Sequence, residues 1–219
     1  MKHPSEDLSE AFSTANIADD LLALRHAAET RNGDHAQYWL KRLLIHMDYY
    51  YSLAVLVERV YDFVETWEGY YPKEVWPRKI ILAVVNVGIK PESALIEMAM
   101  QQSFHAPGAG NFLKALYDMT QAMDEKHQPE ARLGFIISAI MNANMAILVE
   151  AYYGTRLGEW EQVRTNQFDP DTGTYSNPEA NQISYQFWTD TDTALIDSDL
   201  WLQVADSVEE KFKRMGLLP

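Results

Sequence analysis

Cysteine is absent from the 219 residues of this chain. Without thiols there can be no disulfide, no thiolate nucleophile, and no cysteine ligands for a zinc finger or an iron–sulfur cluster. Metal binding would therefore depend on histidine and carboxylate side chains. None of the six histidines has a glutamate three residues before it, as di-iron helical bundles require, and no His-Glu-x-x-His motif occurs. We predict no bound metal and no cofactor.

Basic residues are also few. The chain has 18 Lys and Arg against 32 Asp and Glu, which gives a formal net charge of −14. Contacts with nucleic-acid phosphates or with an anionic membrane surface need clustered positive charge, so this balance opposes both. An acidic protein instead attracts cationic molecules. We predict a protein partner, cationic in character, with no direct nucleic-acid binding.

Long apolar runs are almost absent. The first twelve residues contain no apolar stretch typical of a secretory signal, so we expect a cytoplasmic protein. One segment, residues 133–153, is nearly long enough to span a bilayer. Asn142, Asn144 and Glu150 would be costly in lipid, and no positive cluster flanks the segment. We therefore predict the central helix of a soluble bundle and no membrane contact.

Motifs for nucleotide binding and for serine catalysis are missing. No G-x-S-x-G occurs. The stretch "SFHAPGAGNFLK" at 103–114 contains Gly108, Gly110 and Lys114, but a P-loop needs four residues between its glycine and the Gly-Lys-Ser/Thr, and it follows a strand. Here the flanking pattern is helical on both sides. We interpret the glycines as a tight corner between two helices, with anion binding at the second helix as the alternative.

Helical periodicity dominates the chain, whereas runs of alternating polar and apolar residues are not seen. The pattern predicts an all-α protein, a multi-helix bundle around two long helices at about 35–68 and 129–153. An irregular acidic segment at 166–197, with room for a small hairpin at "DPDTGTY", precedes a C-terminal helix at about 199–215. We predict that 1–219 form a single helical domain on which 166–197 is docked.

A candidate ligand pocket lies between the two predicted long helices. His46 falls on the apolar stripe of the first. In the second, small and polar residues recur every fourth position and form one seam: Gly134, Ser138, Asn142, Ala146 and Glu150. The seam is typical either of close helix packing with Asn142 hydrogen-bonded across it, or of a pocket floor. The pocket hypothesis names His46, Ser138, Asn142 and Glu150.

A candidate interaction surface lies in the acidic segment, and we call residues 165–200 the acidic aromatic surface. Between Arg164 and Lys211 there is no basic residue, yet ten carboxylates are present. Six large rings interleave with them: Phe168, Tyr175, Tyr185, Phe187, Trp188 and Trp201. Because exposed rings are unfavourable in water, we expect the rings to dock the segment onto the helical body or onto a second subunit, with the carboxylates pointing outward. The predicted contact residues are Asp169, Asp171, Asp190, Asp192 and Trp188, and calcium bound by the Asp-x-Asp pairs is the alternative.

Three functions remain open. The first is a non-catalytic helical interaction or accessory protein that self-associates as a homo-oligomer and binds a cationic partner through the acidic aromatic surface. The second is a small helical enzyme or ligand-binding protein with the pocket described above. The third is an acidic mimic that occupies a nucleic-acid-binding protein. The first is favoured because each candidate catalytic motif lacks the residue spacing that its chemistry requires, and the sequence identifies no catalytic residue.

Overall fold

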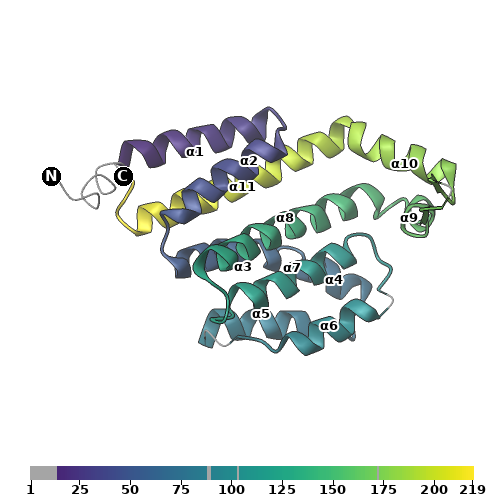
Figure 1. Cartoon of the computed structure of the whole chain (residues 1–219), viewed down its shortest axis with the longest axis horizontal. Helices are drawn as coiled ribbons and strands as arrows, with labels where there is room; N and C mark the ends of the chain where they lie inside the picture. Colours follow the sequence, from purple (N-terminus) through teal and green to yellow (C-terminus); the bar gives the residue numbers. More distant parts are fainter. Residues whose placement is uncertain (1–13, 88–89, 103, 172) are drawn as a thin grey trace. The chain divides into compact units, whose positions relative to one another are not determined.

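The protein is all-α (Figure 1). A computed structural model describes residues 14–87, 90–102, 104–171 and 173–219. Its helices are α1 (Thr14–Glu29), α2 (Gly33–Ile45), α3 (Tyr49–Tyr61), α4 (Val64–Tyr70), α5 (Trp76–Val87), α6 (Ser93–Gln101), α7 (Ala109–Ala122), α8 (Pro129–Tyr153), α9 (Leu157–Arg164), α10 (Pro178–Thr189) and α11 (Thr191–Arg214). The only strand pairing among the described residues joins β1 (Phe168–Asp169) and β2 (Thr174–Tyr175), antiparallel and two residues long.

The chain forms two compact units. The first contains residues up to Val55 together with Ser198–Pro219, and the second contains Leu56–Asp197. The boundaries fall inside α3 and inside α11. The prediction of a single domain is left open by this division.

In the first unit, α1 packs against α2 and the C-terminal part of α11 (Figure 1). A tight turn joins α1 to α2: Arg31 has a φ of 57°, and the N–H of Asn32 donates to the carbonyl of Ala27. The side chain of Asn32 then caps α2 by accepting from the N–H of His35 at 3.1 Å. Arg25 holds α11 against α1 through ion pairs with Asp206 and Glu209, both at 2.6 Å.

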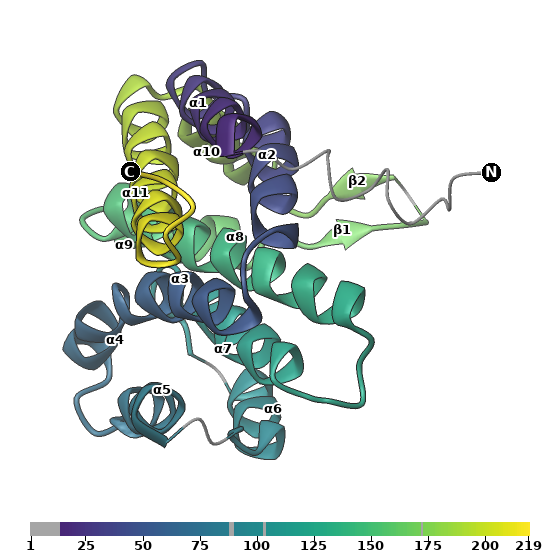
Figure 2. The ribbon, with the colours of Figure 1, turned by 90° about the vertical axis from the view of Figure 1, so that its left-hand side faces the viewer.

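In the second unit, α7 and α8 lie side by side in both views and carry much of the core (Figure 2). Trp67 of α4 is fully buried among the rings of Tyr71, Trp76, Phe104 and Phe112. Its indole N–H donates to the carbonyl of Glu74 at 2.9 Å, so the one polar atom of this side chain is satisfied inside the core.

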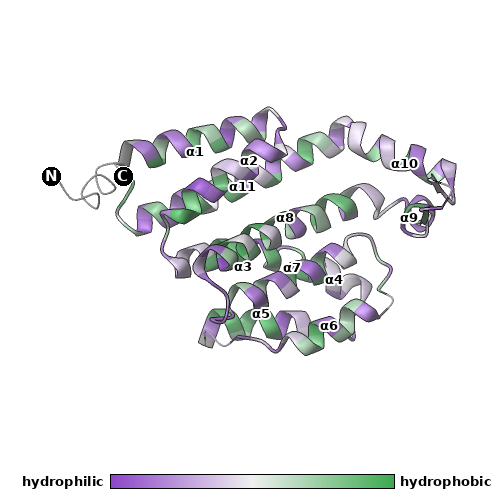
Figure 3. Cartoon of the chain, viewed as in Figure 1, coloured by the Kyte–Doolittle hydropathy of each residue, from purple (hydrophilic) through white to green (hydrophobic). Residues whose placement is uncertain are grey.

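The predicted helix at 129–153 is confirmed, with the same bounds. Pro129 occupies its first turn, where the missing N–H costs nothing, and Gly154 ends it. Hydrophobic residues recur along this helix, α8, in Figure 3. The second long helix of the fold is α11, at 191–214.

The predicted helix at 35–68 is wrong, because that stretch forms α2, α3 and α4. Asp48 starts a new helix: its side chain accepts from the N–H of Tyr50 at 2.9 Å, and its carbonyl accepts from Tyr51 and Ser52. Aspartate is a strong N-cap, so it begins a helix without any glycine or proline to end the previous one. A second, shorter break falls at residues 62–63.

The acidic segment at 166–197 is less irregular than predicted. It contains the expected small hairpin of β1 and β2, but also α10 and the first turns of α11. Asn177 caps α10 by accepting from the N–H of Glu179 at 3.0 Å, and Pro178 follows at the first helical position. The C-terminal helix therefore begins at Thr191 and not near residue 199, because Asp190 caps it.

Candidate functional site

The polar seam of α8 is engaged by a carboxylate on α7. The hydroxyl of Ser138 donates to Oδ2 of Asp118 at 2.7 Å, and the amide of Asn142 reaches the same oxygen at 3.5 Å. The Asn142 amide also donates to the carbonyl of Ser138 at 2.9 Å. Ser138 and Asn142 are half-buried, whereas Asp118 is fully buried. These bonds are the interhelical packing arrangement that the seam predicted as one of its two alternatives.

Asp118 is the centre of this cluster, and its second oxygen forms an ion pair with Lys114, one turn earlier on α7. The Lys114 side chain is 41% exposed, so the cluster reaches solvent at its cationic end. A buried carboxylate that accepts from Ser138, Asn142 and Lys114 has compensated for much of its lost hydration. Sequence reasoning missed Asp118, although the signal was present: it lies on the buried stripe of α7 with Ala115 and Ala122.

The other two residues of the predicted pocket have contacts of their own. Glu150 is two turns beyond Asn142, about 12 Å along the helix, and its Oε1 accepts from the hydroxyl of Tyr70 at 3.4 Å. Burial raises the pKa of the Tyr70 hydroxyl, and the neighbouring Glu150 carboxylate raises it further. His46 caps the end of α2 in the first unit, whereas the other three belong to the second.

The glycine stretch forms the corner between α6 and α7, and at Gly108 it packs closely against α8. Gly108 is the N-cap of α7 with a φ of 78°, and a Cβ built on it would overlap the carbonyl oxygen of Ala146 and lie 3.0 Å from the ring of Phe63. A Cβ on Gly110 would meet no atom within 4 Å. Lys114 forms an ion pair with Asp118, so its charge is already compensated within the protein. This supports the interpretation of the stretch as a corner between helices over the alternative of an anion site.

A matched pair of asparagines on α8 tests the seam. Asn144 is 4% exposed, and neither polar atom of its side chain has a hydrogen-bond partner within the described chain. Replacing Asn142 by Leu should destabilise the protein by about 1–3 kcal/mol, because Asp118 loses a donor. Replacing Asn144 by Leu should be neutral or stabilising, because an unsatisfied buried amide is removed. Urea denaturation of both variants checks this, and equal destabilisation would contradict it.

The rings of the acidic aromatic surface divide into two groups. Phe187 is buried on α10 against Tyr152 and Tyr153 of α8, with centroids at 5.3 and 5.5 Å, and Trp201 is buried as well. The other four rings are exposed in the single chain and do not dock the segment onto the helical body, so their docking onto a second subunit stays a prediction: Phe168, Tyr175, Tyr185 and Trp188. The helical period explains which residues of α10 are buried. Ala180 and Phe187 share its buried face, and Tyr185 and Trp188 therefore lie on the exposed side.

The carboxylates of this surface have different environments. Asp190 accepts from the N–H of Thr193 at 2.9 Å and from its hydroxyl at 3.3 Å, and these bonds lower the pKa of the Asp190 carboxyl. Asp192 is exposed in the first turn of α11, and Asp171 is exposed in the hairpin turn, where it has an interaction partner. Asp169 pairs its backbone with Thr174, and its side chain lies outside the described set.

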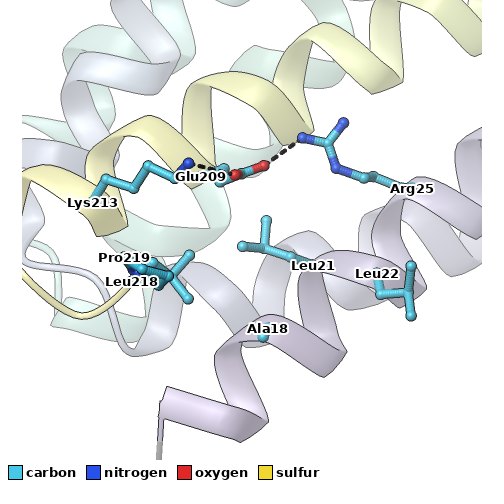
Figure 4. A pocket seen from close by; sticks show the side chains of 8 residues that line it. All are labelled: Ala18, Leu21, Leu22, Arg25, Glu209, Lys213, Leu218 and Pro219. Atoms are coloured by element: carbon cyan, nitrogen blue, oxygen red, sulfur yellow. Dashed lines mark hydrogen bonds and ion pairs between the residues drawn. The ribbon is translucent and has the colours of Figure 1, made fainter.

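A small apolar groove lies in the first unit, between α1, the end of α11 and the chain's last residues (Figure 4). Its volume is about 300 Å³, and Ala18, Leu21, Leu22 and Leu218 form the apolar part of its lining. On its rim Glu209 accepts from both Arg25 at 2.6 Å and Lys213 at 3.0 Å. The two cations are therefore already neutralised by carboxylates of the same protein.

Within the described residues, no three histidine or carboxylate side chains gather in a way that could hold a metal ion. The expectations of no metal and no cofactor stay predictions. Among the described helices, α8 alone is long and apolar enough to cross a membrane. Half of its most apolar stretch is buried inside the protein, and the core helices of soluble proteins have the same length and composition.

Comparison with family models, with curated proteins and with solved structures finds no match to this chain. Function is therefore argued from the side chains alone.

Proposed function

We propose that this protein is a non-catalytic interaction protein that binds a cationic protein segment through the acidic aromatic surface. The observation that carries the proposal is the exposure of Tyr185 (69%) and Trp188 (62%), one turn apart on α10, in a stretch without a basic residue. Trp188 is the only exposed one of the six tryptophans. Large rings that remain in water are typical of the contact residues of protein interfaces.

The carboxylates around these rings define the chemistry of the partner. Asp190 and Asp192 follow Trp188 directly, and Glu179 lies at the start of the same helix. Arginine suits such a surface best, because its guanidinium stacks on aromatic faces and pairs with carboxylates through two parallel hydrogen bonds. An arginine-rich segment is therefore the partner that fits this face.

The enzyme alternative has less support. Ser138 and Asn142, which would act in a pocket, both donate to Asp118, and Asn142 donates to the carbonyl of Ser138 as well. Self-association stays a prediction of its own, which the molar mass from light scattering of the purified chain would check.

The test is titration of the full chain with a synthetic arginine-rich peptide, followed by tryptophan fluorescence and by calorimetry. Replacing Tyr185 and Trp188 by Ala should weaken binding by tenfold or more, as loss of contact residues does. The matched control is Tyr50→Ala, since Tyr50 is 77% exposed outside this surface. Equal weakening by the control, or no binding at low salt, would contradict the proposal.

A second comparison separates the surface from the general negative charge. Asp190→Asn with Asp192→Asn removes two charges beside Trp188, and Asn keeps the capping role of residue 190. Asp19→Asn with Glu29→Gln removes two exposed charges from α1. Only the first pair should reduce both the affinity and its dependence on salt, because charges farther from the bound peptide than a Debye length are largely screened, whereas the charges beside Trp188 act on it directly.

A further inference from the structure

A polar hollow of about 490 Å³ lies in the second unit where α8, α9 and α10 meet. It is lined by Tyr152, Arg156, Glu159, Gln186, Thr189 and Asp190. The volume is in the range of small-molecule sites. Its lining is mostly polar, so it suits a charged ligand better than an apolar one.

Arg156 is held in place at the side of this hollow. Its guanidinium lies 4.1 Å from the centroid of the Tyr152 ring, and that ring is buried and packed against Phe187. Such stacking orients the guanidinium plane while leaving its N–H groups available. In the described part of the chain Arg156 forms no ion pair, unlike Arg164, which is paired with Glu161. The carboxylate of a ligand would form an ion pair with Arg156.

Two carboxylates, Glu159 and Asp190, line the same hollow. The N–H and hydroxyl of Thr193 lower the pKa of the Asp190 carboxyl, and the positive charge of Arg156 lowers it further. The hollow thus presents one fixed positive charge and two negative ones. The complementary ligand carries one carboxylate and two cationic groups, and Gln186 and Thr189 add neutral hydrogen-bonding groups.

We propose that this hollow binds a free basic amino acid, such as lysine or arginine, with the α-carboxylate on Arg156 and the two cationic groups on Glu159 and Asp190. This goes beyond the proposed function, because it assigns a small-molecule site that shares only Asp190 with the peptide-binding surface. It also explains why an arginine without an ion pair lies beside two carboxylates.

The test is calorimetric titration of the full chain with L-lysine and L-arginine. Cadaverine lacks the carboxylate of lysine, and Nα-acetyl-lysine lacks the α-ammonium, so each should bind about tenfold more weakly or worse. Arg156→Gln should weaken L-lysine binding by a similar factor but should not weaken cadaverine binding, because it removes a positive charge that repels this dication. Glu159→Gln should weaken both.

The matched control is Arg164→Gln, which removes a partly exposed arginine outside the hollow. It should leave lysine binding unchanged, and circular dichroism checks that every variant is folded. Absence of saturable binding up to about 10 mM, or equal loss in the control, would overturn the proposal. So would tighter binding of a peptide ending in arginine, because the ligand would then be a protein terminus.

Discussion

Replacing Gly108 by Ala is expected to destabilise the protein by at least about 3 kcal/mol. Two costs add at this position. The left-handed backbone, with a φ of 78°, disfavours any Cβ, and the new methyl group would overlap the carbonyl oxygen of Ala146 on α8. Because that obstacle is backbone within a helix, a side-chain rotation cannot relieve it, and α7 has to move away from α8.

The matched control for this variant is Gly110→Ala, two residues later. A Cβ on Gly110 meets nothing within 4 Å, and the residue lies in the first turn of α7. Alanine is the better helix former, so this change should be neutral or stabilising by up to about 1 kcal/mol. Thermal and urea denaturation of both variants, followed by circular dichroism, measure the difference. Equal stability of the two would show that Gly108 is not the close contact described here.

The glycine corner also shows what sequence reasoning can reach. The spacing of Gly108 and Gly110 was enough to predict a corner between helices, because it failed the pattern of a phosphate loop. Which of the two glycines is constrained depends on Ala146, 38 positions away from Gly108 in the printed chain. Contacts at such separation leave no local signal, so only the structure distinguishes the two.

The sequence marks the ends of some helices more clearly than those of others. Pro129 and Gly154 mark α8 at both ends, and its bounds were predicted correctly. The stretch at 35–68 lacks both residue types, so its periodicity predicted one helix. The break depends on the side chain of Asp48, which accepts the N–H of Tyr50. Aspartate is equally compatible with the solvent-exposed face of a helix, so the residue type alone does not show that Asp48 caps one.

The acidic segment illustrates a different limit. Its charge and its rings were read from composition, but composition does not determine which rings are buried. The helical period of α10 places Phe187 inward and Trp188 outward, though they are neighbours in sequence. Docking onto the helical body therefore holds for Phe187 but not for Trp188, whose docking onto a second subunit stays a prediction. The exposed rings become the basis of the proposed function.

Replacing Asp118 by Ala is expected to destabilise the protein by about 2–4 kcal/mol. Ser138 and Asn142 would each lose an acceptor at a half-buried position. Lys114 would lose its ion pair, but 41% of its side chain is exposed, so water can solvate the charge. The cost should therefore arise mainly from the two neutral donors, and less from an uncompensated buried charge.

A double-mutant cycle separates these contributions. Ser138→Ala alone should cost about 1–2 kcal/mol, since it removes one hydrogen bond to a charged group. Combined with Asp118→Ala, it should add little, because its partner is already gone, which gives a coupling energy of about 1–2 kcal/mol. The same cycle with Lys114→Met should give a smaller coupling, since that pair is partly solvated. A larger coupling for Lys114 than for Ser138 would show that Asp118 is held chiefly by the lysine, and the cluster would then be an ion pair at the edge of the fold and not the polar contact that joins α7 to α8.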